Sequence, residues 1–191
     1  LQVMSWLDEQ LEYDDIILLG GSEGALVAAM VASRSDKVSA VITLNGGGRF
    51  FVDDVFYSMS IDLPPEAFEQ AKQGFLEFKG AIESSESMTL VMSGHGFRWW
   101  KSMLAADQTE LLLSVSAPLL IIQSELDKSV SPKLAYDQAR MLMKKRNNVE
   151  FRTVKGVDHK FHDPSGKDRT SEVVSSVKKW LGSSQITSEI R

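Results

Sequence analysis

A serine flanked by glycines is the first group in this sequence with the surroundings of a nucleophile. Residues 18–26 read LLGGSEGAL, so Gly20-x-Ser22-x-Gly24 follows an apolar run directly and precedes a helix-like stretch. A serine at such a strand-to-helix turn points its Oγ outward, and the first helix amides can stabilise a negatively charged oxygen. We therefore predict Ser22 as a nucleophile and the backbone N–H of Glu23 as an oxyanion donor. A phosphate-binding turn is the alternative, but no lysine follows Ser22 as that motif requires.

Two later loops supply the groups that a serine nucleophile needs, a base and a carboxylate that orients the base. Asp127 follows the apolar run 119–123, and His159 follows the run 149–154. The C-terminal ends of parallel strands meet at one edge of a sheet, so we expect Ser22, His159 and Asp127 to lie together. This order along the chain predicts a triad of nucleophile, acid and base.

The base and the acid each have a rival nearby in the sequence. Glu125 is a second acidic residue in the same loop as the candidate acid, and His162 is an alternative base. Residues 158–163, DHKFHD, also contain two histidines and two carboxylates, as a metal site can, but no third histidine is near. We expect no metal and no cofactor, and we interpret Asp158 and Asp163 as surface or loop-capping residues.

The side chain of Glu23 lies next to the predicted nucleophile and has two interpretations. A carboxylate in the first turn of a helix interacts favourably with the positive end of the helix dipole. The same charge can repel an acidic substrate or attract a substrate amine. The first interpretation is the simpler one, and the second remains open.

Four short apolar runs predict strands, and two of them are continuously apolar, as in strands that helices cover on both faces. Segments between and after these runs have the composition or the spacing of helices. The alternation predicts a single α/β domain over residues 1–191, with a mostly parallel sheet and flanking helices. The expected strands are 16–19, 38–44, 119–123 and 149–154, and the expected helices are 23–33, 132–145 and 171–181.

Together these motifs resemble the α/β-hydrolase superfamily, in particular serine hydrolases with a G-x-S-E-G turn that are grouped with esterases and serine peptidases. The matching segments read LLGGSEGALVAAMVA, DKVSAVITLNG, APLLIIQSELDKSVSP and GVDHKF. The resemblance implies Ser22 as nucleophile, Asp127 as acid, His159 as base and hydrolysis through an acyl-enzyme without a cofactor. We expect a carboxylic ester as the substrate, with a peptide or amide as the first alternative. An acyltransferase or thioesterase is the third.

A long segment, residues 49–116, separates the second and third expected strands. It contains an expected helix at 64–84, a second element near 97–106 and a capping box at 107–110 that opens a short third helix. Such an insertion predicts a helical lid over the C-terminal edge of the sheet. Its aromatic residues are more typical of packing than of ligand contacts, but some must roof the pocket if the lid covers the serine. The candidates for an apolar or aromatic acyl pocket are Phe50, Phe97, Trp99 and Trp100.

The composition excludes several other classes of protein. A net charge of -5 and a pI near 5.3 are unfavourable for binding nucleic-acid phosphates. The 191 residues include no cysteine, which excludes disulfides and thiolate metal sites and is typical of a reducing compartment, so we expect a cytoplasmic protein. No apolar run approaches the roughly 20 residues that span a bilayer. We therefore expect a small-molecule ester or peptide as the partner.

The resemblance implies more strands ahead of Ser22 than this sequence contains. The family has several strands and a loop with a second oxyanion donor before the nucleophile strand, whereas residues 1–15 predict one amphipathic helix. An apolar strand at 16–19 with an open edge invites pairing, so we expect a preceding segment, a second copy of the chain or that helix to cover it. We favour the preceding segment, because the sequence begins with Leu1 rather than Met. A catalytically impaired fragment that serves as an interaction module is the alternative from another class.

Overall fold

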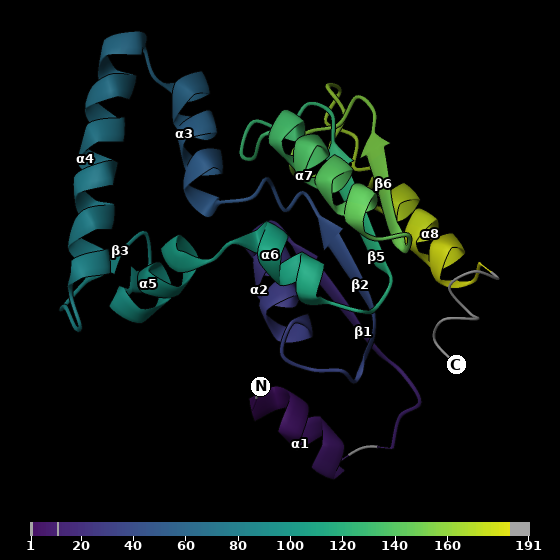
Figure 1. The fold of residues 1–191 in the computed structure, drawn as a ribbon. Helices are drawn as coiled ribbons and strands as arrows, with labels where there is room; N and C mark the ends of the chain where they lie inside the picture. The colour runs from purple at the N-terminus through teal and green to yellow at the C-terminus, as the bar shows by residue number, and fades with distance from the viewer. Residues whose placement is uncertain (1, 11, 184–191) are drawn as a thin grey trace.

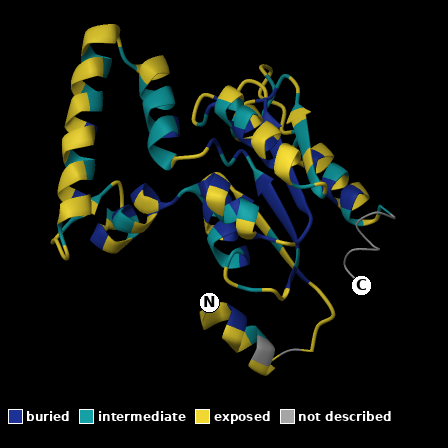
Figure 2. Cartoon of the chain, viewed as in Figure 1, coloured by how far each residue is buried: buried dark blue, intermediate teal, exposed yellow. Residues whose placement is uncertain are grey.

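Four parallel strands form the central sheet of the computed structural model, which describes residues 2–10 and 12–183. The strand order is β1-β2-β5-β6, and all three pairings are parallel (Figure 1). β5 is buried along its whole length, as a strand with helices on both faces must be (Figure 2). The predicted α/β fold with a parallel sheet is therefore confirmed. The strands are β1 Ile16–Gly21, β2 Val38–Leu44, β5 Leu119–Ser124 and β6 Val149–Val154.

Helices cover the two faces of this sheet unequally. Met4, Ala29, Leu112 and Leu142, from four different helices, pack on one face in a single hydrophobic cluster. On the other face one helix packs Val173, Val177 and Trp180 against Ile42, Leu120 and Ile122. The first face carries α1 Gln2–Gln10, α2 Glu23–Ala32, α6 Gln108–Ser114 and α7 Pro132–Lys145, and the second carries α8 Thr170–Leu181.

Most of the segment between β2 and β5 extends to one side of the sheet (Figure 1) and has a hydrophobic core of its own. Phe75, Ile82, Phe97, Trp100 and Leu104 form that core. Its aromatic rings make edge-to-face pairs, such as Phe78–Trp100 with centroids 5.2 Å apart. The part of this segment that precedes α6 comprises α3 Phe51–Asp62, α4 Pro65–Ser84, the two-stranded hairpin β3 Val91–Met92 and β4 His95–Gly96, and α5 Phe97–Ala105. α4 and α5 match the predicted elements, whereas α3 and the hairpin were not predicted from the sequence.

β1 lies at one edge of the sheet, and among the described residues only β2 pairs with it. The side chains of Ile17 and Leu19 are 42% and 56% exposed there. The predicted N-terminal amphipathic helix corresponds to α1, although Leu1 and Leu11 lie outside the described residues. No helix within residues 2–10 and 12–183 is long and apolar enough to cross a membrane.

Candidate active site

Ser22 occupies the sharp turn between β1 and α2. Its backbone has φ 52° and ψ -125°, a region that residues with a side chain rarely adopt. The Ser22 N–H donates to the carbonyl of Leu44 at 2.8 Å, which ties the turn to the end of β2. A Cβ on Gly20 would lie 2.0 Å from the carbonyl oxygen of Gly24, so glycine is required there for strand and helix to approach. The local structure therefore has the strain and the close approach of a nucleophile turn.

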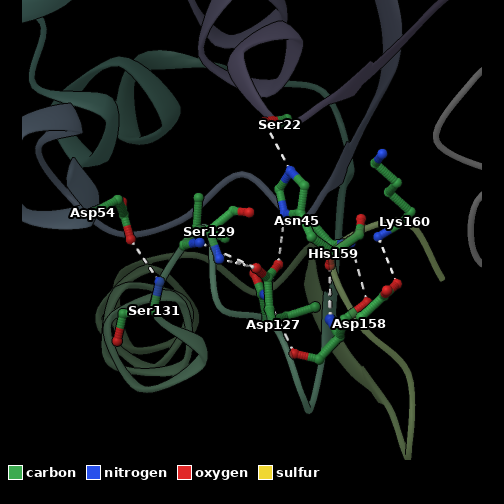
Figure 3. Close-up of polar contacts among 12 residues, drawn as sticks. Ser22, Asn45, Asp54, Asp127, Ser129, Ser131, Asp158, His159 and Lys160 are labelled. Atoms are coloured by element: carbon green, nitrogen blue, oxygen red, sulfur yellow. Dashed lines mark hydrogen bonds and ion pairs between the residues drawn. The ribbon is translucent and has the colours of Figure 1, made fainter. Parts of the chain in front are cut away.

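His159 bridges Ser22 and Asp127 through its two ring nitrogens (Figure 3). Its Nε2 lies 3.0 Å from Ser22 Oγ, and its Nδ1 lies 2.8 Å from Asp127 Oδ2. The three residues come from the loops after β1, β6 and β5, which meet at the C-terminal edge of the sheet. The structure thus brings the three sequence-predicted residues together in hydrogen-bonding order.

Asp127 is almost completely buried, and each of its oxygens accepts two hydrogen bonds. Oδ1 accepts from the backbone N–H groups of Ser129 at 2.8 Å and Val130 at 3.1 Å. Oδ2 accepts from the side chain of Gln123 at 3.0 Å as well as from the ring of His159. Four donors of this kind hold the carboxylate in one orientation, as a residue that orients a histidine must be held.

Asn45, which sequence reasoning missed, joins the strand ends that carry the site. It follows β2 directly, is buried and has φ 49°. Its Nδ2 donates to the carbonyl of His159 at 2.8 Å and to Ser124 Oγ at 3.0 Å, and its Oδ1 accepts from the N–H of Ser124 at 2.7 Å. Asn45 therefore fixes the backbone of His159 against the end of β5. Its signal in the sequence is a lone polar residue at the end of a buried strand.

A second missed residue, Asp54 of α3, holds the loop of Asp127 from the opposite side. Its carboxylate accepts from the N–H groups of Gly48 and Ser131, both at 2.8 Å. Burial raises the pKa of Asp54 to about 6, although these two hydrogen bonds act in the opposite direction. One turn further along α3, Tyr57 donates its hydroxyl to the carbonyl of Asp127 at 2.9 Å. Burial, and after it the charges of Asp127 and Asp54, raise the pKa of the Tyr57 hydroxyl.

The rival residues hold the loops together. Glu125 accepts from the N–H of Gly156 at 2.9 Å, which joins the loops after β5 and β6. Asp158 accepts from the N–H of Lys160 at 2.9 Å (Figure 3) and from the N–H of His162 at 2.9 Å. The hydrogen bond from His162 is the main cause that lowers the pKa of Asp158. The ring of His162 lies near Asp158, at 3.8 Å, and it is His159 that contacts Ser22. No three acidic or histidine side chains in the described part of the chain form a metal-binding group.

A cavity of about 520 Å³ opens beside Ser22. Its walls include Leu26 of α2, Phe51, Val55 and Met59 of α3, and Trp99 and Met103 of α5. Trp99 alone of the four aromatic residues expected at the pocket borders this cavity. Its indole donates to the Glu23 carboxylate at 2.7 Å and stacks on His95 at 3.8 Å.

The other three expected pocket residues lie elsewhere. Phe97 and Trp100 point into the aromatic core of the insertion. They are three residues apart and so lie on the same side of α5, whereas Trp99 faces the cavity. Trp100 also donates to the carbonyl of Met92 in the hairpin at 3.1 Å. Phe50 is 37% exposed and lies under the guanidinium of Arg49. The sequence showed that aromatic residues gather here but not which of them face the cavity.

The parallel sheet and the strained serine turn together define an α/β hydrolase. Residues 3–164 match the family model described as BAAT / Acyl-CoA thioester hydrolase C terminal. The chain therefore belongs to this family of hydrolases. No curated protein is significantly similar in sequence.

The solved structures with the same fold include esterases and another hydrolase. An esterase of Pyrococcus furiosus is 16% identical with a TM-score of 0.59, and the match covers 93% of this chain and 57% of that one. The esterase domain of a Rhodothermus marinus protein is 16% identical with a TM-score of 0.57, over 94% and 65% of the two chains. An E-2-(acetamidomethylene)succinate hydrolase is 16% identical with a TM-score of 0.56, over 95% and 72%. The chain thus spans a little over half the length of the Pyrococcus esterase.

Proposed function

We propose that this chain carries the catalytic residues of a serine hydrolase that cleaves a carboxylic ester through an acyl-enzyme on Ser22. The observation that carries the proposal is the continuous line of hydrogen bonds from Ser22 Oγ through His159 to Asp127. The unusual backbone of Ser22 supports it, because strain of this kind is found where a side chain must be presented to a substrate.

In the proposed mechanism Ser22 Oγ attacks the carbonyl carbon of the ester while His159 Nε2 takes the hydroxyl proton. Asp127 keeps the Nδ1 proton of His159 in place and stabilises the imidazolium. The backbone N–H of Glu23, at the start of α2, donates to the oxyanion. The tetrahedral intermediate collapses, His159 protonates the leaving oxygen, and the acyl group stays on Ser22. Water, deprotonated by His159, then releases the acid and restores the serine.

A thioester is the second candidate substrate, and the family match favours it. The same steps apply to a thioester, in which sulfur is the leaving atom. A thiolate needs less assistance from a proton donor to leave than an alkoxide does. A peptide or amide is the third candidate, since acyl transfer to serine serves all three. We also propose that residues 49–116 act as a lid, because α3 and α5 form walls of the cavity beside Ser22.

Labelling with a fluorophosphonate probe tests the nucleophile directly. We expect the protein to be labelled, and the Ser22→Ala and His159→Gln variants to lose both labelling and turnover of p-nitrophenyl esters. Matched acyl oxyesters, thioesters and anilides would rank the three substrate classes. Undiminished turnover in a pure Ser22→Ala preparation would contradict the proposal. The control is Ser129→Ala, which retains the Ser129 N–H that Asp127 accepts.

The expectation that residues 16–19 are covered stays a prediction. The exposed side chains of Ile17 and Leu19 and the open edge of β1 support it, because an uncovered apolar edge promotes association. We propose a further strand that pairs with β1 as the cover, and self-association of the chain is the alternative. The 191 residues expressed alone would then be less soluble or more oligomeric than a longer gene product. A soluble monomer with full activity would contradict this proposal.

A further inference from the structure

The cavity beside Ser22 runs along one face of α3. Phe51, Val55, Met59 and Asp62 all line it, and their spacing of three to four residues places them on successive turns of the same face. Phe51 lies at the nucleophile end, where its ring packs against Trp99, the residue that donates to Glu23. Asp62 is the last residue of α3, roughly 16 Å further along the helix axis. A chain-like acyl group attached to Ser22 therefore has an apolar path along α3 that ends at Asp62.

The charges around this path are all of one sign. Glu23, Asp54 and Asp62 line the cavity, and none of its described lining residues is a lysine, arginine or histidine. Glu23 is engaged by the indole of Trp99, and Asp54 by two backbone N–H groups. Asp62 is exposed and lies at the C-terminal end of α3, where the helix dipole adds partial negative charge. A positively charged group is therefore stabilised most at the far end of the cavity, beside Asp62.

We propose that this cavity is an acyl subsite for an extended apolar acyl group with a positively charged end, and that Asp62 selects that end. The inference rests on the proposed function, because the acyl group is the part of the substrate that stays on Ser22. An acyl group that ends in a carboxylate meets three like charges and no partner, so the subsite rejects it. The apolar side chains of α3 and α5 bind the intervening methylene groups.

Three p-nitrophenyl esters whose twelve-carbon chains match the length of the path along α3 test the selection. They carry 12-(trimethylammonio)dodecanoate, its uncharged carbon isostere 13,13-dimethyltetradecanoate, and the monoanion of dodecanedioate. At low ionic strength we expect kcat/KM for the cationic ester to exceed that of the isostere about fivefold, and that of the anionic ester to fall below it by a similar factor. The preference appears mainly in KM, because the charged end lies far from the reacting carbonyl, and it shrinks at 0.5 M salt.

The Asp62→Asn variant identifies the selecting residue. We expect it to reduce the preference for the cationic ester over its uncharged isostere to less than twofold. Asp53→Asn is the matched control, since it removes the same charge from the same helix at a position that does not line the cavity. Equal kcat/KM for the cationic ester and its isostere, or equal effects of the two variants, would overturn the subsite inference. Failure of all three esters together with absent labelling of Ser22 would instead overturn the proposed function.

Discussion

Replacing Ser22 by glycine rather than by alanine separates the strain of its turn from its chemistry. The φ of 52° and ψ of -125° at Ser22 are disfavoured for any residue with a Cβ. Ser22→Ala keeps that Cβ and therefore keeps the strain, whereas Ser22→Gly removes it. Both variants lose the hydrogen bond between Oγ and His159 Nε2, so its contribution cancels when they are compared.

The expected difference in unfolding free energy follows from two opposing effects. Backbone strain at such a residue costs about 1–3 kcal/mol, and glycine relieves it. Glycine in turn gives the unfolded chain more freedom, which destabilises the variant by about 0.4–1 kcal/mol relative to alanine. We therefore expect Ser22→Gly to be more stable than Ser22→Ala by about 1 kcal/mol. For a domain of this size that difference corresponds to about 2–4 °C in Tm.

Urea unfolding and thermal melting of the two variants measure this difference. Equal m values would show that only stability has changed. Both variants should fail to react with the fluorophosphonate probe, so a gain in stability would accompany the loss of the nucleophile. If Ser22→Gly unfolds at the same urea concentration as Ser22→Ala or a lower one, the turn is not strained, and the argument that its geometry serves presentation of Oγ is refuted.

Three further substitutions test the support of the site. Asn45→Ala should lower kcat more than it changes KM in ester assays, and cost about 1–3 kcal/mol of unfolding free energy, because the N–H of Ser124 loses its buried acceptor. Burial raises the pKa of Asp54 from 3.8 to about 6, so the folded protein is destabilised as Asp54 ionises, and the unfolding free energy of wild type should fall by about 2 kcal/mol relative to Asp54→Asn between pH 4 and 7 in urea titrations. A rise with pH in the unfolding free energy of wild type relative to Asp54→Asn would contradict a raised pKa of Asp54. Gly20→Ala should lower Tm sharply, at a cost of about 3 kcal/mol, because its Cβ meets the Gly24 carbonyl; an unchanged Tm would mean that strand and helix can separate.

The sheet could be predicted because its strands are short, apolar and buried on both faces. The continuous apolar run at 119–123 is visible in the sequence and becomes β5, and the spacing of apolar residues in 171–181 becomes α8. α3 was missed for the opposite reason. Its side chains face the cavity, the aromatic core and the loop of Asp127, so no single polar face marks the helix. The order of polar and apolar residues in α3 can be interpreted only when the cavity, the aromatic core and the loop of Asp127 are known.

The site divides in the same way between residues with a local motif and residues without one. Ser22 has its glycines, and Asp127 and His159 follow strand ends in the order that the resemblance implied. Asn45 contacts Ser124 and His159, and Asp54 contacts Ser131, across 77 to 114 positions of the chain, and no spacing in the sequence encodes such contacts. The orientation of Trp99 toward the cavity, and of Trp100 away from it, likewise depends on the rotation of α5 against the sheet.

The separate core of the insertion bears on how relatives of this protein can diverge. Because α4, α5 and much of α3 pack on one another, mutations there can reshape the cavity while the sheet and its loops keep their packing. The part of α3 up to Tyr57 has less freedom, since Asp54 and Tyr57 hold the loop of Asp127. Met59 and Asp62, in its second half, line the cavity without such ties to that loop in the contacts described above. Natural variation in acyl preference should therefore concentrate in the last turn of α3, and directed evolution of new preferences would best begin there.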